Sequence, residues 1–107
     1  MPFMADDAPS RDLVGRRAID AAGSTVGTIT DVITDRETGK AKWAVIDLGF
    51  FKHEHFAPLA HAYRTDDNGL VLDVEKRFIA DAPKAGKDEV WNADIEHQLV
   101  EYYSVST

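Results

Sequence analysis

Residues 26–48 read VGTITDVITDRETGKAKWAVIDL, which predicts two β-strands joined by a tight turn. The first run, Val26 to Thr34, is rich in Val, Ile and Thr, whose branched side chains suit a pleated sheet. The second run, 42–48, is mostly apolar. Between the two runs, Asp35 can accept hydrogen bonds from the backbone that follows it, and Gly39 can adopt a positive φ. These features are typical of a β-hairpin.

The apolar residues of the first run do not alternate simply along the strand. Ile29 and Ile33 fall on one set of alternate positions, and Val26 and Val32 fall on the other. A strand that is buried on one face should alternate cleanly, so the mixed pattern predicts that both faces are covered. A small barrel whose outer face meets a helix, a loop or a second subunit fits this pattern.

Composition limits the classes of partner that we expect. The chain has 107 residues, a formal net charge of −7 and no cysteine, and it is one domain by length. The acidity argues against direct contact with nucleic acid or an anionic membrane, because both favour Lys and Arg. Without cysteine, disulfides and thiolate metal sites are excluded, which fits a reducing compartment. We see no signal peptide and no apolar run of membrane length, so we expect a cytoplasmic protein.

The rest of the chain divides into four parts. We expect a mobile tail over residues 1–10, a barrel over 11–83, a hinge over 84–89 and an amphipathic helix over 90–103. Within the barrel, the pattern predicts further strands at 13–20, 53–58, 63–65 and 70–74, a helical turn at 59–62 and a short helix at 75–81. Residues 66–69, Asp-Asp-Asn-Gly, are the expected turn between the last two strands, with Asn68-Gly69 as the cue.

The predicted terminal helix has one apolar stripe, formed by Trp91, Ile95, Leu99 and either Tyr102 or Tyr103. Asn92 is a suitable residue to cap its start. The stripe must lie on the barrel of its own chain or, through exchange at a hinge containing Gly86, on the barrel of another.

Several short segments resemble the PRC-barrel family in their order and spacing. They are Leu13-Val14-Gly15-Arg16, the Val26–Val32 run, Trp43-Ala44-Val45-Ile46, Ala57-Pro58-Leu59 and Ala82-Pro83. The resemblance implies a mainly β fold, a small six-stranded β-barrel. The family includes the H subunit of the photosynthetic reaction centre, a ribosome maturation factor and archaeal cell-division proteins. All of these use the barrel as a docking module, dimers are common, and no catalytic residues are shared, so no catalytic role carries over.

Three histidines form the candidate ligand set. His53 and His55 would point to one face of a strand, and His61 follows six residues later. Imidazole binds zinc, copper or nickel, but a structural zinc site needs four protein ligands and no fourth is evident. We therefore predict no metal and no cofactor, and expect a solvated or interface strand. A metal site and a pH-sensitive interface are the alternatives.

Phe50 and Phe51 are adjacent aromatic residues that cannot both point inward from one extended strand. Exposed aromatic residues are enriched at interfaces. The predicted interface residues are Phe50, Phe51, Trp91, Ile95, Leu99 and Tyr102.

The function that we predict is a non-enzymatic protein–protein interaction module, which forms a homodimer and docks an unidentified protein partner. One alternative is a small-molecule or metal-binding sensor that uses the histidine face. The other is a ribosome-maturation accessory that docks a basic ribosomal protein, which would suit the acidic surface.

Overall fold

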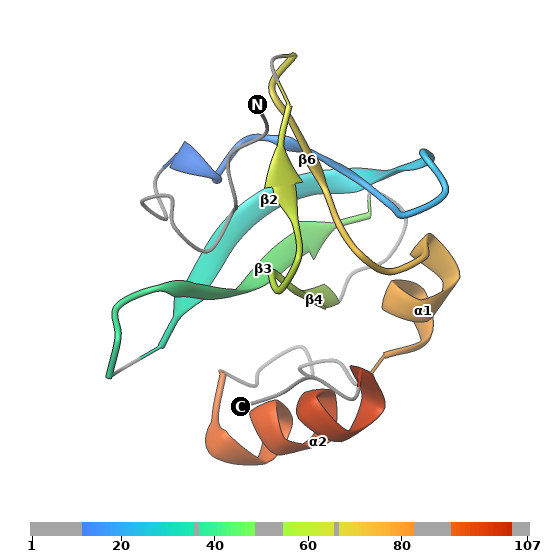
Figure 1. The fold of residues 1–107 in the computed structure, drawn as a ribbon. Helices are drawn as coiled ribbons and strands as arrows, with labels where there is room; N and C mark the ends of the chain where they lie inside the picture. The colour runs from blue at the N-terminus through green and yellow to red at the C-terminus, as the bar shows by residue number, and fades with distance from the viewer. Residues whose placement is uncertain (1–11, 36, 49–54, 66, 83–90, 104–107) are drawn as a thin grey trace.

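A computed structural model describes residues 12–35, 37–48, 55–65, 67–82 and 91–103, and shows a six-stranded sheet with two helices (Figure 1). The strands are β1 (Arg17–Ile19), β2 (Thr25–Thr34), β3 (Ala41–Asp47), β4 (His55–Pro58), β5 (Tyr63–Arg64) and β6 (Gly69–Val71). The helices are α1 (Lys76–Asp81) and α2 (Ala93–Tyr103). The predicted tail and hinge, together with Phe50, Phe51 and His53, lie outside the described residues.

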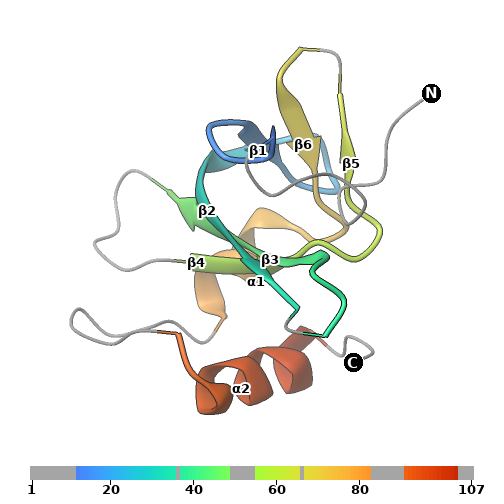
Figure 2. The same ribbon diagram turned by 90° about the vertical axis from the view of Figure 1, so that its left-hand side faces the viewer.

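The strands follow the order β4-β3-β2-β1-β6-β5. All neighbouring pairs are antiparallel except β1 and β6, which are parallel. The prediction of a mainly β, six-stranded fold is confirmed. However, β4 and β5 stand at opposite ends of the order, so the sheet is not closed within the described residues. Figures 1 and 2 both show α2 beneath the part of the sheet that contains β3 and β4.

The mixed apolar pattern of β2 has a cause that the sequence analysis missed. Ile29 lies opposite Ile46 and Val32 lies opposite Ala44, with a register shift between Ile29 and Asp31. Ile46 and Ala44 are two residues apart and share a face, so the irregularity moves Val32 onto the same face as Ile29. A bulge, as well as coverage of both faces, therefore explains why apolar residues occupy both sets of positions.

Both faces of β3 are covered. Ala44 and Ile46 belong to an interior cluster, while Trp43 and Val45 belong to a second cluster on the opposite face. The interior cluster comprises Leu13, Ala18, Val26, Ile29, Ala41, Ala44, Ile46, Leu48, Ala57, Leu59, Ala62, Leu70, Leu72 and Ile79. The outer cluster comprises Trp43, Val45, Phe56, Ala82, Ile95 and Leu99. Helix α2 packs on the sheet through the outer cluster.

Two predictions differ from the structure: the start of the first strand and the helical turn at residues 59–62. The first strand starts at Arg17 and not at Leu13, because Gly15 adopts a φ of 89° in a turn that places Leu13 in the interior cluster. Residues 59–62 form a tight turn and no helix. In this turn, the Ala62 N–H donates to the Leu59 carbonyl at 3.1 Å and His61 has a φ of 64°.

Both helices occur where the sequence predicts them, and side chains fix their first turns. The Asn92 amide oxygen accepts a hydrogen bond from the Ile95 N–H at 3.0 Å, as expected of a cap. The cap of α1 comes from Asp20, far away in the sequence, whose Oδ2 accepts from the Lys76 N–H at 2.9 Å. No helix of the described part is long and apolar enough to cross a membrane.

Candidate functional site

Helix α2 closes the outer face of β3 and β4 with its apolar stripe. Ile95 is 5% exposed and Leu99 is fully buried in the outer cluster. The Trp91 ring, at the start of the helix, lies 5.1 Å from the Phe56 ring and 6.0 Å from the Trp43 ring between centroids. Of the two packing arrangements left open by the sequence, the structure contains the one in which the stripe lies on its own sheet. Exchange with a second chain stays a prediction.

Polar contacts fix α2 at both of its ends. Near its start, Glu96 Oε2 accepts a hydrogen bond from Trp43 Nε1 at 3.1 Å and pairs with Lys42 Nζ at 3.2 Å. At its end, the Tyr103 hydroxyl donates to the Phe56 carbonyl of β4 at 2.8 Å. Burial raises the pKa of Tyr103, which keeps the hydroxyl protonated as a donor. The last contact also occupies a backbone acceptor of β4, a strand that stands at an end of the sheet.

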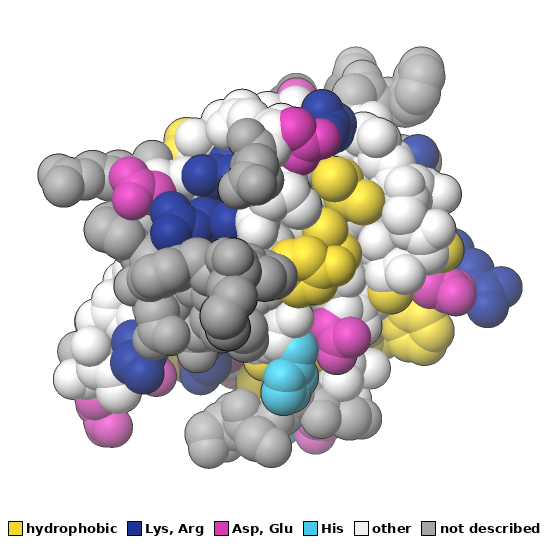
Figure 3. Space-filling model, turned by 45° about the horizontal axis from the view of Figure 1, so that its top comes forward, with side chains coloured by type: hydrophobic (Ala, Val, Ile, Leu, Met, Phe, Trp, Pro, Cys, Tyr) yellow, Lys and Arg dark blue, Asp and Glu magenta, His cyan; other side chains and the backbone are white. Residues whose placement is uncertain are grey.

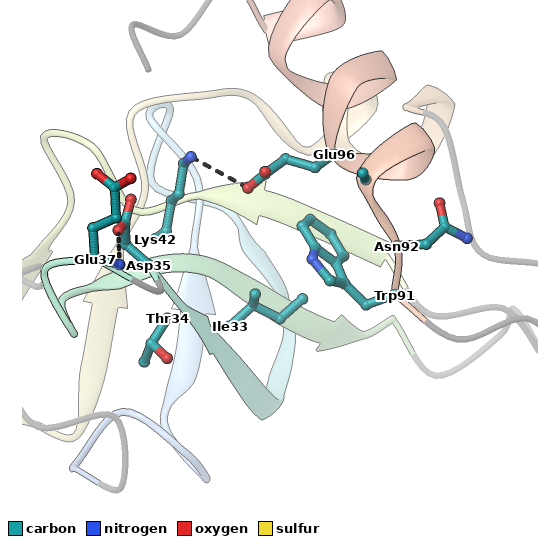
Figure 4. A pocket seen from close by; sticks show the side chains of 9 residues that line it. Ile33, Thr34, Asp35, Glu37, Lys42, Trp91, Asn92 and Glu96 are labelled. Carbon is teal, nitrogen blue, oxygen red and sulfur yellow. Dashed lines mark hydrogen bonds and ion pairs between the residues drawn. The ribbon is translucent and has the colours of Figure 1, made fainter.

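A pocket of about 640 Å³, here called the hairpin pocket, opens between the β2–β3 turn and the start of α2 (Figure 4). It is lined by Ile33, Thr34, Asp35, Glu37, Lys42, Trp91, Asn92, Ala93 and Glu96. In Figure 4, the Trp91 ring enters from the side of α2, whereas Asp35 and Glu37 enter from the side of the turn. The ion pair between Lys42 and Glu96 spans the space between these two sides.

The turn side of the hairpin pocket is held rigid by Asp35. Its Oδ1 accepts hydrogen bonds from the backbone N–H groups of Glu37 at 2.7 Å and Thr38 at 3.1 Å. These bonds, above all the one from Thr38, lower the pKa of Asp35, so the carboxylate stays ionised at neutral pH. The predicted bonding of Asp35 to the following backbone is confirmed, and Gly39 has the expected positive φ of 72°.

The other end of α2 carries an exposed aromatic surface, here called the aromatic face, which consists of Phe78, Tyr102, Val74 and Ala21 with their charged neighbours. Phe78 is 46% exposed, and its ring centroid is 5.5 Å from that of Tyr102. The Tyr102 hydroxyl donates to the Phe78 carbonyl at 2.8 Å. A shallow pocket of about 550 Å³ lies here, lined by Ala21, Asp73, Val74, Glu75, Arg77, Phe78, Tyr102 and Tyr103.

Figure 3 shows how charge is distributed over one face of the molecule. Basic and acidic side chains are interspersed there, with small apolar areas between them, and no basic stripe runs across this view.

The predicted histidine set does not share one surface. His55 is fully buried and lies opposite Ile46, on the side of the interior cluster, whereas His61 is exposed in the turn after β4. His53 lies outside the described residues. Within the described part of the chain, no three His, Cys, Asp or Glu side chains are grouped as metal ligands would be.

The predicted interface residues divide into three groups. Trp91 and Tyr102 are partly exposed and mark the two ends of α2, while Ile95 and Leu99 are buried within the chain. Phe50 and Phe51 lie outside the described residues, and the interface prediction for them is untested. The sequence analysis missed Phe78 as a surface residue. The exposure of Phe78 could have been inferred, because a helix of six residues buries only one narrow stripe and Ile79 already occupies that stripe.

Comparison with known proteins agrees with this architecture. A family model described as the PRC-barrel domain matches residues 6–85. An uncharacterised protein of Deinococcus radiodurans is 26% identical over 96 residues, which cover 87% of this chain and 35% of that protein. The chain thus spans about a third of the length of the relative that it matches. The family model covers most of the chain, and the six-stranded sheet agrees with it. The chain therefore belongs to the PRC-barrel family.

Proposed function

We propose that this protein is a non-enzymatic assembly module, which self-associates through the aromatic face and docks another protein. The observation that supports the proposal best is Phe78, a large aromatic side chain that is 46% exposed and yet held in place. Its ring contacts Tyr102, whose hydroxyl bonds to the carbonyl of Phe78 itself. The homodimer and the cytoplasmic location predicted from the sequence are parts of this proposal.

A fixed aromatic side chain is a good interface anchor for an energetic reason. Association immobilises side chains at a cost of about 0.5–1.5 kcal/mol for each flexible one. The ring of Tyr102 already contacts the ring of Phe78, which restricts the side chain of Phe78 before any partner arrives. Interface hot spots are enriched in aromatic residues that enter a pocket on the partner, and the neighbouring pocket beside Phe78 offers such a space.

The charges around the aromatic face favour a second copy of the chain as the occupant. Arg77 Nε pairs with Glu75 Oε2 at 3.1 Å, and the two side chains are 81% and 49% exposed. A two-fold interface brings the same surface against itself, so it must carry complementary charges. The described rim carries Arg77 beside the acidic residues Asp73 and Glu75, so each Arg77 can meet an acidic side chain such as Glu75 of the partner subunit.

Velocity sedimentation tests the proposal by comparing three proteins: the wild-type chain, the Phe78→Ser variant and the Val14→Ser variant. Val14 is 44% exposed in the turn before β1 and serves as the matched control, because it removes a similar exposed apolar side chain elsewhere. We expect a dimer for the wild type and Val14→Ser, and a monomer for Phe78→Ser at the same concentration. Circular dichroism checks that each variant is folded. A wild type that is monomeric at all concentrations, or a Phe78→Ser variant that remains dimeric, would overturn the proposal.

A further inference from the structure

The hairpin pocket is at the opposite end of α2 from the aromatic face, and self-association leaves it open. We propose that the hairpin pocket binds an arginine side chain, presented by a basic segment of the protein that this module docks. The inference rests on the proposed function, because it specifies the partner of a docking module. It is carried by an aromatic wall, an excess of negative charge and the size of the pocket.

The wall is the indole ring of Trp91. Its contacts with Phe56 at 5.1 Å and with Trp43 at 6.0 Å support it from the side of the sheet. The ring also lines the hairpin pocket, together with Ile33 from β2. A planar guanidinium group stacks on an aromatic face and is less strongly hydrated than an ammonium group, so a fixed indole ring favours arginine over lysine.

Among the residues that the structure describes in the lining of the hairpin pocket, three carry carboxylates, Asp35, Glu37 and Glu96, and one, Lys42, carries an ammonium group. Lys42 already pairs with Glu96, whose Oε2 also accepts from the Trp43 indole. Asp35 and Glu37 therefore provide the unbalanced negative charge. Asp35 keeps its charge over the physiological pH range, because its backbone hydrogen bonds lower its pKa. A guanidinium group that enters the hairpin pocket can donate two parallel hydrogen bonds to one carboxylate, such as that of Glu37.

The same surroundings disfavour an anionic ligand. The start of α2 lines the pocket, and a helix start attracts anions through its free N–H groups. Here the Asn92 side chain already accepts from the Ile95 N–H, and Asp94 and Glu96 place two carboxylates in the first turn. An incoming anion would meet these carboxylates as well as those of the turn.

The size of the hairpin pocket favours a protein segment over a small cation. A volume of about 640 Å³ lies in the range of pockets that hold drug-sized molecules, and exceeds what one side chain fills. An arginine together with the backbone on either side of it would occupy the space more completely than a free amine. A polyamine is also positively charged, so the test must distinguish a free polyamine from an arginine in a protein segment.

Nuclear magnetic resonance of the ¹⁵N-labelled full chain provides the test, because the two indole N–H signals report on Trp91 and Trp43 separately. The Trp91→Phe variant lacks one of these two signals and thereby identifies which signal belongs to Trp91. The probes are a blocked five-residue peptide with a central arginine between alanines, its citrulline and lysine analogues, and spermidine. We expect a saturable shift of the Trp91 signal with the arginine peptide, at least tenfold weaker binding of the citrulline peptide and weaker binding of the lysine peptide.

Two variants locate the binding. Glu37→Gln should weaken the binding of the arginine peptide at least threefold, while Glu101→Gln, which removes an exposed carboxylate on α2 outside both pockets, should leave its affinity unchanged. No saturable shift of Trp91, an equal loss in both variants, or tighter binding of spermidine than of the arginine peptide would overturn the inference. Phe78→Ser should bind the peptide like the wild type, so the failure of self-association and the failure of this pocket are separate results.

Discussion

Replacing Leu99 by alanine tests whether α2 is an integral part of the fold. Leu99 is fully buried in the outer cluster, between the helix and the face of the sheet that carries Trp43 and Phe56. The substitution removes three carbon atoms, which at about 0.8 kcal/mol per buried methylene amounts to about 2.5 kcal/mol of transfer free energy. The cavity left behind adds to this loss, so we expect a total of about 3 kcal/mol in the free energy of unfolding.

Urea denaturation of the wild type and Leu99→Ala measures this loss. Fluorescence reports on Trp43 and Trp91, which both adjoin the outer cluster, and far-ultraviolet circular dichroism reports on the whole chain. The two transitions should coincide, because α2 and the sheet share one core. In a thermal scan, the loss corresponds to a decrease in Tm on the order of 15 °C.

Gln98→Ala is the control for this substitution, because Gln98 is the exposed neighbour of Leu99 on the same helix. Its effect should lie within about 0.5 kcal/mol. A loss below about 1 kcal/mol for Leu99→Ala, with an unchanged dependence on urea concentration, would refute the packing of α2 on its own sheet. Two separate transitions would refute a single cooperative unit.

Two further substitutions test how the sheet and α1 are held. A Cβ on Gly27 would overlap the Asp47 carbonyl of β3, whereas a Cβ on Gly39 meets nothing within 4 Å and adds only the strain of an alanine at a φ of 72°. Gly27→Ala should therefore lower the urea midpoint of unfolding more than Gly39→Ala, and equal midpoints would contradict the close approach of β2 and β3. Asp20→Asn should cost about 1 kcal/mol at pH 7, because it weakens the acceptor that caps α1. Burial would raise the pKa of Asp20, but the backbone hydrogen bonds that it accepts, the one from Lys76 foremost, lower it below 3.8. The stabilisation is thus fully present above the unfolded pKa and is lost as the pH falls through the lower folded pKa, so the difference in urea midpoint between the wild type and the variant should shrink as the solution is made more acidic. A difference that does not change with acidification would contradict the assignment.

Strand and helix positions followed from local chemistry. Val, Ile and Thr between turn residues placed β2 and β3, Asn68 with its positive φ placed the turn before β6, and Asn92 placed the start of α2. In each case, the determining residues lie within a few positions of the element. This is why the sequence alone was sufficient.

The parts that escaped prediction depend on contacts between distant segments. The bulge in β2 is visible only in the register of Ile29 and Val32 against β3. The cap of α1 comes from Asp20, which is 56 residues from its donor Lys76. No local pattern encodes such pairings.

The hairpin pocket likewise unites segments that are remote in sequence. Its turn side comes from Asp35 and Glu37, its ion pair from Lys42 and Glu96, and its wall from Trp91. Nothing local in the sequence indicates that the start of a helix lies opposite the acidic residues of the turn. The burial of His55 was not visible in the sequence for a related reason, because strand spacing does not reveal which face is interior.

Hydrogen–deuterium exchange at two protein concentrations tests the central claim, assembly through the aromatic face, most directly. The account predicts that peptides covering α1 and the end of α2 exchange more slowly at high concentration than at low concentration, and that peptides covering the β2–β3 turn exchange at the same rate in both. Protection that appears instead at β5 and β6, or rates that do not depend on concentration anywhere, would contradict it.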